Sequence, residues 1–556
     1  RLIRGGSFVI RPAVSGGRSP SLARVRSVSR GAAALLLGIL AIVIRSAPSD
    51  AKPRGALADT LQALAGGTLD QVTVGALAVS LDRGDTLFAW RERDRLVPGS
   101  NTKIFTTGAF LTRFGLDARW DTRLLARGSA SVKDGGRRVR FKGDLVLQGS
   151  GVPDVTALLR PGSRGLVDSM AVRLRSEGLE RFEGTLWVDG SIFVRDPYPE
   201  GWTHDDMVYS YSAPVNGILA NGNAISLIAT EREGRVTLTL DPPESPLTVR
   251  GAISLADAGS APRLAVRRDL GSTVLEVSGS VPPGGVARQQ VAVTDPDSTA
   301  GLLLLGAMKR AGIETKAVVR VLPERAEDAG KKRKDVEPFL AAASPGTPAA
   351  GQPWSAVRGD RAAAVLTHAS PTAAEIVSMV NTYSLNTEAE ALLRMLDPAP
   401  KGKRTQRGLA ELYRILSESG INGADVLLTD GSGLSRMNLA TARALVAWLT
   451  VLDRALGPRF REGLSTPGGN GTLANRLQDL EPGVTLRGKT GTLSNVGSLS
   501  GYVTSKDGER LVFALIGNGT RGSVAPLRSV QDHLVRLLGG TRRAVATPVR
   551  PWGIPR

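Results

Sequence analysis

Strand-like segments at both ends of the chain enclose its helical segments, and this order restricts the fold more than any other feature. Residues 71–94 alternate apolar and polar side chains on both sides of a short Arg-Gly-Asp turn, which predicts a β-hairpin. Residues 486–505 and 509–519 also read as strands, and helical patterns at 371–396 and 439–456 precede them. We therefore expect an α+β fold in which the two ends of the chain form one antiparallel sheet, flanked by helices.

The segment between these two halves differs in composition. Residues 120–345 are rich in Gly, Val and Arg and contain short strand-like runs, which predicts an inserted, mostly β region. Within 322–354, a charge run mixed with Pro, Ala and Gly indicates a solvated linker or insertion. The expected order is a signal or anchor segment at 1–51, the first part of the main domain at 55–125, the inserted region at 126–320, the linker or insertion at 321–360 and the second part of the main domain at 361–545.

The composition excludes several kinds of site. The 556 residues include no cysteine, which excludes disulfides, thiolate catalysis and zinc–thiolate sites. His204, His368 and His533 are far apart in sequence, and no G-x-S-x-G stretch supports a Ser-His-Asp enzyme. The net charge of +19 comes mainly from scattered arginines, without a motif that interleaves aromatic and basic side chains. We therefore expect no nucleic-acid partner.

The N-terminal segment has the pattern of a secretory leader. Residues 1–30 contain seven arginines and no acidic residue, and an uncharged apolar run of 14 residues follows at 31–44. This run suits the apolar core of a signal peptide and is short for a membrane-spanning helix. Ser49 and Ala51 offer a small-x-small cleavage site. We expect an exported protein of the periplasm or cell envelope, with residues 31–44 either removed or retained as an anchor.

A serine and a lysine stand three residues apart at the start of a predicted helix. Ser100 and Lys103 in PGSNTK would share one face of that helix. A serine hydroxyl needs a base to become a good nucleophile, and a lysine can serve when burial and neighbouring cations lower its pKa. Ser100 is therefore a candidate nucleophile and Lys103 its candidate base, although S-x-x-K alone is a weak signal.

Two later stretches strengthen this interpretation. In TYSLNTEAE, Ser384 and Asn386 lie between two helical runs, where Ser384 could relay a proton and Asn386 could bind Lys103 or substrate. In LRGKTGTL, on a predicted strand, Lys489 would be the second cation. Three neighbours complete the candidate substrate site: Thr490 as a donor to a carboxylate, Gly491 as a point of close backbone approach, and Thr492, whose N–H would form an oxyanion hole with that of Ser100.

The same lysine also fits a second motif. Residues 483–490, GVTLRGKT, match G-x-x-x-x-G-K-[ST], the loop that binds the phosphates of a nucleotide. That loop requires a strand before it and a helix after it. Here the residues that follow, TGTLSNVGSLSGYV, continue as strand and turn. The serine-enzyme interpretation therefore accounts for Lys489 better.

The ordered set S-x-x-K, S-x-N and K-T-G is typical of penicillin-binding proteins and class A β-lactamases. Lys103 and Ser384 are 281 positions apart, and such a large insertion resembles the D-alanyl-D-alanine carboxypeptidase/endopeptidase family, the low-molecular-mass class C penicillin-binding proteins. The resemblance runs from about residue 55 to 540 and includes PGSNTK, GDLVLQGSGVPD, WVDGSIFVRDPYPEGW, YSAPVNGILANGN, DGSGLSRMN, NGTLANRL and GKTGTLSNVGSLSGYV.

The resemblance implies a penicillin-recognising, transpeptidase-like domain interrupted by two small, mostly β domains. It implies that Ser100 attacks the penultimate D-alanine carbonyl of a peptidoglycan stem peptide, that no metal or cofactor is needed, and that β-lactams acylate Ser100. Either carboxypeptidase or endopeptidase action fits this chemistry. The family often has Asp at the position of Leu385, and a segment like 322–354 is shorter and less charged there.

Two other functions remain open, and no oligomeric state is predicted. A β-lactamase or esterase on the same scaffold would turn over penicillin rapidly instead of forming a stable adduct. A non-catalytic cell-wall-binding protein would have lost a motif residue, and none is lost here.

Overall fold

The computed structural model describes residues 72–159, 165–323 and 352–543. The predicted leader at 1–51 and most of the predicted linker at 321–360 lie outside these residues. No helix within the described ranges is long and apolar enough to span a membrane.

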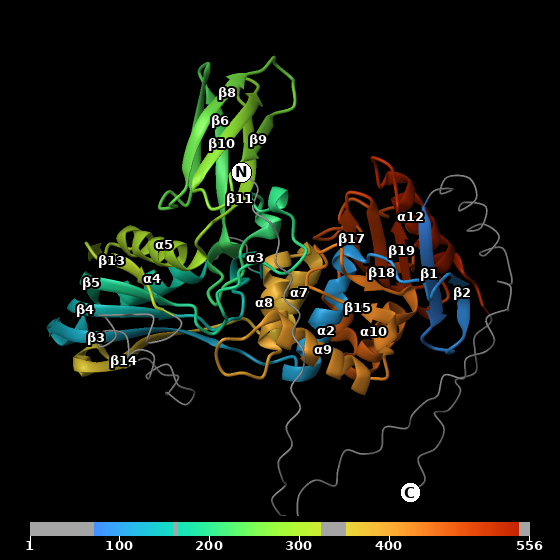
Figure 1. Ribbon diagram of the computed structural model, residues 1–556, viewed down its shortest axis with the longest axis horizontal. Helices are drawn as coiled ribbons and strands as arrows, with labels where there is room; N and C mark the ends of the chain where they lie inside the picture. Colours follow the sequence, from blue (N-terminus) through green and yellow to red (C-terminus); the bar gives the residue numbers. More distant parts are fainter. Residues whose placement is uncertain (1–71, 160–164, 324–351, 544–556) are drawn as a thin grey trace, which may run out of the picture. The chain divides into compact units, whose positions relative to one another are not determined.

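The main domain contains a five-stranded sheet that joins the two ends of the described chain. The strand order is β17-β18-β19-β1-β2, and every neighbouring pair is antiparallel. Figure 1 shows the blue strands β1 and β2 beside the orange and red strands β17, β18 and β19. The predicted α+β fold with one antiparallel sheet is therefore confirmed. The strands are β1 (Thr73–Ser80), β2 (Thr86–Trp90), β17 (Thr485–Leu493), β18 (Val496–Thr504) and β19 (Arg510–Asn518).

Strand β19 shows how the sheet separates two cores. Val512 and Ile516 belong to the core shared with most of the helices, whereas Leu511, Phe513 and Leu515 pack with the C-terminal helix α12 (Ala525–Gly540). Successive side chains of a strand point to opposite faces, so a continuous apolar run fills both cores. The sheet is thereby covered on both faces, which keeps β17 and its lysine in a fixed position.

The helical layer carries the segment that follows the candidate nucleophile. Its central helix α2 begins one residue after Asn101, and Ile104 and Phe105 on it are fully buried. A Cβ atom at Gly108 would lie 2.6 Å from the indole nitrogen of Trp448, so glycine allows α2 and α10 to pack closely. The helices are α2 (Thr102–Phe114), α7 (Ala373–Tyr383), α8 (Asn386–Met395), α9 (Thr405–Glu418), α10 (Ala442–Leu456) and the short α11 (Pro458–Glu462).

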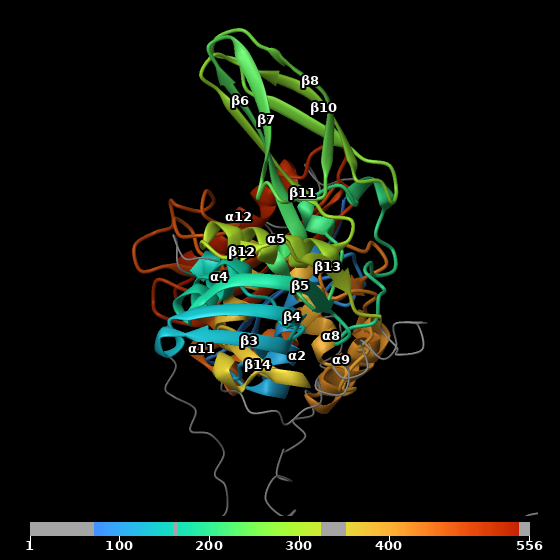
Figure 2. The same ribbon diagram turned by 90° about the vertical axis from the view of Figure 1, so that its left-hand side faces the viewer.

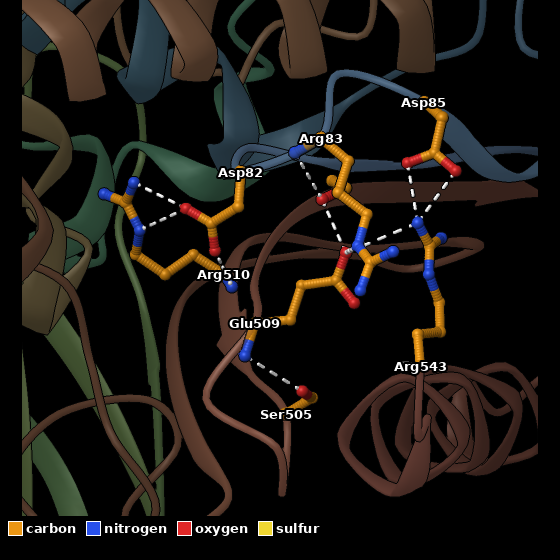
Figure 3. A network of polar contacts seen from close by, with 8 residues as sticks. Asp82, Arg83, Asp85, Ser505, Glu509, Arg510 and Arg543 are labelled. Atoms are coloured by element: carbon orange, nitrogen blue, oxygen red, sulfur yellow. Dashed lines mark hydrogen bonds and ion pairs between the residues drawn. The ribbon is translucent and has the colours of Figure 1, made fainter. Parts of the chain in front are cut away.

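A polar network joins the turns at one end of the five-stranded sheet (Figure 3). The carboxylate of Glu509 accepts a hydrogen bond from Ser80 at 2.6 Å and lies 3.1 Å from Arg83 and 3.5 Å from Arg543. These contacts join the β1–β2 turn to the start of β19 and to the residues after α12. We call this set the turn network; its members are Ser80, Asp82, Arg83, Asp85, Glu509, Arg510 and Arg543.

The inserted region contains a six-stranded mixed sheet. Its order is β12-β5-β4-β3-β14, with β13 also paired to β5. Figure 2 shows β5, β4, β3 and β14 side by side. Strand β3 is antiparallel to β4 and β14, whereas β4 and β5 are parallel. The strands are β3 (Asp121–Lys133), β4 (Arg138–Gln148), β5 (Leu179–Asp189), β12 (Glu314–Thr315), β13 (Val318–Val321) and β14 (Arg358–Ala369).

Two helices pack against one face of this mixed sheet. Met170 and Leu174 of α4 (Leu166–Ser176) and Leu304 of α5 (Pro296–Arg310) are buried together with Phe141 and Phe182 of the strands. The first inserted domain therefore combines a sheet with two helices. The short helix α3 (Thr156–Leu159) follows β4 in this region. The two-stranded pair β15 (Val426–Leu427) and β16 (Leu439–Ala440) lies between α9 and α10 of the main domain.

A second inserted domain lies between β5 and α5 in sequence and consists of strands alone. Two three-stranded sheets, β11-β6-β7 and β8-β10-β9, share a small core that includes Ala229, Val281 and Ala287. Short alternating strands in two packed sheets are typical of a β-sandwich. The strands are β6 (Ala224–Arg232), β7 (Arg235–Asp241), β8 (Thr248–Leu255), β9 (Arg263–Arg267), β10 (Val274–Val281) and β11 (Val286–Ala292).

The expected domain limits of 126, 320 and 361 differ from the limits of the strands. Strand β3 begins at Asp121, and β14, which pairs with it, runs from Arg358 to Ala369 across the expected boundary. Pairing between segments more than 200 residues apart leaves no local signal, because a strand pattern does not identify its partner. The mixed sheet is thus closed by residues that follow the predicted linker.

Candidate active site

The candidate nucleophile lies in a tight turn that leads into α2. Ser100 is the middle residue of a short 3-10 helix, Gly99–Asn101, and Gly99 has a φ of 52°, a conformation that favours glycine. Lys103 lies in the first turn of α2 with no exposed surface. Its Nζ is 3.1 Å from the Oγ of Ser100. The predicted pair is thus within hydrogen-bond distance, with the lysine held in the apolar interior.

The amine of Lys103 has two further partners, both carbonyl oxygens. Its Nζ lies 2.6 Å from the side-chain oxygen of Asn386 and 2.6 Å from the backbone oxygen of Ser432. A neutral amine has two N–H groups and one lone pair. Since carbonyl oxygens can only accept, they take both N–H groups, and the lone pair is left for the hydroxyl of Ser100. The geometry therefore suits a lysine that acts as a base.

Burial favours the neutral form of this lysine. It lowers the pKa of Lys103 from 10.5 to about 8, although the charges of Asp430, Glu390 and Glu388 act in the opposite direction. A base with a pKa near the working pH is present in its neutral form often enough to accept a proton. The three carboxylates keep the pKa from falling further.

The second motif lies at the junction of α7 and α8. Ser384 ends α7 in the left-handed conformation, with φ 59° and ψ 42°, and its Oγ accepts a hydrogen bond from Lys489 at 2.8 Å. Asn386 begins α8, and its amide nitrogen donates to the backbone oxygen of Tyr211, in the inserted region, at 2.7 Å. Leu385 packs against the helical core. The leucine that departs from the family pattern therefore contributes to packing.

The third motif occupies β17, where Lys489 is fully buried and pairs in register with Ser500. Its Nζ donates to the backbone oxygen of Thr490 at 2.7 Å, in addition to its contact with Ser384. Burial, together with the charge of Lys103, holds the pKa of Lys489 well below its usual value. Electrostatic repulsion is mutual, so a charge on either lysine favours the neutral form of the other.

Gly491 allows β17 to approach the nucleophile turn. A Cβ atom there would lie 2.7 Å from the backbone oxygen of Pro98 and 2.9 Å from the amide nitrogen of Ser100. On the facing side, a Cβ atom at Gly99 would lie 3.5 Å from the amide nitrogen of Thr492. The backbone amides of Ser100 and Thr492 therefore belong to segments in close contact, as an oxyanion hole formed by the two would require.

Two serines of β18 hold the nucleophile turn and were not predicted as site residues. Asn101 donates to the Oγ of Ser498 at 2.5 Å and accepts a hydrogen bond from Ser500. Ser498 in turn donates to the backbone oxygen of Pro98 at 2.6 Å. Alternate small polar residues in the otherwise apolar strand VGSLSGYVT were the only signal in the sequence.

The sequence analysis also assigned no site residue to DGSGLSRMN, although this stretch is part of the family resemblance. The 430–438 loop, DGSGLSRMN, supplies the backbone oxygen of Ser432 that binds Lys103. Its first residue, Asp430, is fully buried and accepts hydrogen bonds from the amides of Gly433 and Ser435, both at 2.7 Å. Backbone acceptors have no residue signature, although a run of Gly and Ser between Asp and Asn indicates an ordered turn.

The nucleotide-loop interpretation of residues 483–490 does not hold. These residues lead into β17, which pairs along its length with β18 and continues directly into it through a tight turn. A phosphate-binding loop needs the N-terminus of a helix after its lysine. Lys489 instead lies in the middle of an antiparallel strand with its side chain fully buried.

Comparisons with known proteins identify the family of this chain. The family model described as D-Ala-D-Ala carboxypeptidase 3 (S13) matches residues 56–331 and 351–539, and the gap between the two stretches falls within the predicted linker or insertion at 321–360. A D-alanyl-D-alanine carboxypeptidase of Actinomadura sp. (strain R39) is 29% identical over 554 residues, covering 95% of this chain and 92% of the relative. The carboxypeptidase DacB of Haemophilus influenzae is 23% identical, covering 80% of this chain and 85% of that protein.

Solved structures agree on the fold. The crystal structure of penicillin-binding protein 4 from Haemophilus influenzae superposes with a TM-score of 0.65 at 21% identity, covering 86% of this chain and 99% of that one. A second structure of the same protein, in complex with a β-lactam, has a TM-score of 0.61. The family model matches most of the chain, and the full-length relatives are carboxypeptidases. The chain therefore belongs to the D-Ala-D-Ala carboxypeptidase 3 (S13) family.

Proposed function

We propose that this protein is a serine D-Ala-D-Ala carboxypeptidase and D-alanyl endopeptidase that acts on peptidoglycan stem peptides through an acyl-enzyme. One observation carries the proposal: the Nζ of Lys103 lies 3.1 Å from the Oγ of Ser100, and its two other partners are carbonyl oxygens, which leaves the lone pair of the neutral amine for the hydroxyl. That arrangement activates one hydroxyl, as covalent acyl transfer requires.

In the proposed acylation, Lys103 takes the proton of Ser100 as its Oγ attacks the carbonyl carbon of the penultimate D-alanine. The N–H groups of Ser100 and Thr492 stabilise the oxyanion. The proton that Lys103 has taken then passes through Ser384, which is bound to Lys489, to the amine of the departing D-alanine. The C–N bond breaks and Lys103 is neutral again. Water then hydrolyses the ester on Ser100, and the same groups act in reverse order.

The third motif would bind the substrate's terminal carboxylate. Lys489 supplies positive charge, the Thr490 hydroxyl supplies a hydrogen bond, and the edge of β17 after Gly491 is open for the peptide backbone. In endopeptidase action the D-alanyl cross-link is cleaved. The leaving group is then the cross-linked peptide, which is larger than D-alanine but departs through cleavage of the same kind of bond. The substrate lies in the cell wall, so the proposed function includes export by the leader at 1–51.

β-Lactams present a strained amide and a carboxylate in the positions of the acyl donor, so we propose that they acylate Ser100. Relatives in the comparisons support this point, since one is named a penicillin-binding protein and was crystallised with a β-lactam. A β-lactamase remains the alternative, and a stable rather than a short-lived adduct would separate the two functions.

Labelling with fluorescent penicillin tests the proposal. We expect one stable adduct, located at Ser100 by mass spectrometry of the peptides, and no adduct in Ser100→Ala. Labelling that persists in the alanine variant would contradict the assignment. Incubation with intact cross-linked peptidoglycan then separates the two peptidase activities, because carboxypeptidase action releases free D-alanine and endopeptidase action releases uncross-linked peptides.

A further inference from the structure

A buried carboxylate on α8 lies one helical turn beyond Asn386. Glu390 has no exposed surface, and at a spacing of four residues it shares a helix face with Asn386. Its two carboxylate oxygens each lie 3.0 Å from the amide nitrogen of Gly431, and one lies 2.7 Å from the amide nitrogen of Ser432. One face of α8 therefore contacts Lys103 directly through Asn386 and holds the loop that supplies its other carbonyl partner.

The 430–438 loop is held tightly around this carboxylate. Thr106 of α2 donates to the backbone oxygen of Gly431 at 2.8 Å. A Cβ atom at Gly433 would lie 1.9 Å from the backbone oxygen of Gly99, so the loop also packs directly on the nucleophile turn. Glu390 binds the amides of Gly431 and Ser432 on one side of the Ser432 oxygen, and Asp430 binds the amide of Gly433 on the other, so both carboxylates hold this oxygen toward Lys103.

The charged groups around Glu390 come from three elements. Asp430 lies in the loop, Arg394 lies one turn further along α8, and Lys103 lies on α2. Burial and the charge of Asp430 raise the pKa of Glu390 to about 8, whereas the side chain of Ser432, the amide of Gly431 and the charge of Arg394 act in the opposite direction. The negative charge of Glu390 in turn raises the pKa of Lys103.

We propose that Glu390 is a positioning residue of acylation, which holds the Ser432 carbonyl against Lys103 and whose charge helps to set the proton affinity of that lysine. The inference rests on the proposed function, since it concerns the same base. Glu390 would not contact substrate. Its effect would reach Ser100 through three hydrogen bonds in series: the Ser432 amide donates to the carboxylate, Lys103 donates to the Ser432 oxygen, and Lys103 contacts the hydroxyl of Ser100.

The test compares Glu390→Gln with the parent enzyme. Glutamine has nearly the same shape, but its NH2 group would face amide N–H donors, so the loop must shift. We expect the penicillin acylation rate constant to fall about 10- to 100-fold, because small displacements of catalytic groups cost that much, while the non-covalent dissociation constant stays within about twofold. The acidic limb of the acylation–pH profile should move to lower pH, because displacement of the Ser432 oxygen removes a hydrogen-bond acceptor of protonated Lys103. Near and above the raised pKa of Glu390, a nearby negative charge is lost as well.

A matched control is available at the end of the same helix. Asp397 is also buried, and it accepts hydrogen bonds from the amides of Ala399 at 2.9 Å and Arg404 at 2.8 Å without contact to Lys103. Asp397→Asn should lower the thermal midpoint to a similar degree, yet leave the acylation rate and its pH profile as in the parent. If this control slows acylation as much as Glu390→Gln does, the effect is general destabilisation and the inference is wrong.

Glu390→Asp keeps the charge but draws it back by one methylene group. For this variant we expect slower acylation than in the parent, with the acidic limb near its parental pH. If Glu390→Gln does not fold, the acylation rate of Glu390→Asp tests whether Glu390 positions the Ser432 carbonyl. Parental rates and an unmoved limb in Glu390→Gln would overturn the inference, while stable labelling of Ser100 would leave the proposed function intact. Absence of any Ser100 adduct in the parent enzyme would instead refute the proposed function.

Discussion

Two polar networks on the same five-stranded sheet bury charge in opposite ways. In the turn network, the carboxylate of Glu509 is 8% exposed and faces the guanidinium groups of Arg83 and Arg543 (Figure 3). At the candidate site, two cations, Lys103 and Lys489, are both fully buried, and their direct hydrogen-bond partners are hydroxyls and carbonyl oxygens.

The two networks differ in the groups that surround the buried charged side chain. The neighbours of Glu509 are two guanidinium groups and a hydroxyl donor, and these contacts join the β1–β2 turn to β19. At the site, burial and the presence of a like charge favour the loss of a proton from lysine. A buried lysine that loses its proton has a lone pair for a neighbouring hydroxyl and can take part in chemistry, whereas a carboxylate in direct contact with two guanidinium groups contributes to stability.

Removal of the base should produce the largest effect. Lys103→Met is similar in length and apolar, and it cannot accept a proton. We expect penicillin acylation of Ser100 to fall by about 10²- to 10⁴-fold, the range for loss of a general base. Stopped-flow measurement of acylation checks this. A rate within about threefold of the parent would mean that another group takes the proton.

The same variant should be more stable than the parent at neutral pH. The pKa of Lys103 is about 8 in the folded protein against 10.5 for an ordinary lysine, so its protonation costs on the order of 3 kcal/mol of folding free energy below pH 8. Between pH 8 and 10.5 the unfolded state binds more protons, and the parent's stability should rise with pH. Urea unfolding should therefore show a higher free energy of unfolding for Lys103→Met than for the parent at pH 7. The difference between the two proteins should be smaller at pH 10.

Lys489→Gln tests whether the second buried cation acts on the first. We expect acylation to fall by about 10²-fold, since a positioned donor in a dry site contributes that much. Without the neighbouring charge Lys103 should hold its proton more tightly, so the acidic limb should move to higher pH, opposite to the shift expected for Glu390→Gln. Lys489→Arg should retain more activity than the glutamine form. An unmoved limb in Lys489→Gln would show that the two lysines are not coupled.

Glu509→Gln should have the smallest effect of these variants, and it should change only the stability of the protein. Loss of the carboxylate leaves Ser80 and two arginines with a weaker acceptor, which we expect to cost about 1–3 kcal/mol of unfolding free energy. Acylation and its pH profile should match those of the parent enzyme. A shifted pH profile here would mean that the two networks are coupled through the sheet, and the contrast between them would fail.

The sequence predicted the sheet and the three motifs because their signals are local. Alternation at 71–94 and the apolar runs at 486–505 and 509–519 marked the strands. Ser100 and Ser384 stood at helix boundaries, and Lys489 stood in the K-T-G run of a predicted strand. The order of the motifs carried the resemblance, and the family match confirms it. The roles assigned to these residues stay predictions, although the structure places Lys103 beside Ser100 and Lys489 beside Ser384.

Other features depend on contacts between distant segments. Strand β14 pairs with β3 across more than 200 residues, and the pattern RGDRAAAVLTHA does not indicate that partner. Helices α4 and α5 pack against the mixed sheet. They were not predicted, because the composition of the region favours strands. The pairing of strands and the order of layers depend on packing between distant segments, and the pattern of a single segment does not predict that packing.

By itself, the sequence predicted which groups could react: the hydroxyls of Ser100 and Ser384, two lysines and an asparagine, in an order typical of acyl-serine enzymes. Only the tertiary structure decided how the base is prepared. It buried Lys103, brought the Ser432 oxygen to it across 329 positions of chain, and placed Glu390 behind the loop that presents this oxygen. A backbone carbonyl is the same in every residue, so its use as a partner depends on position alone. Burial likewise changes a pKa through surroundings that distant segments supply.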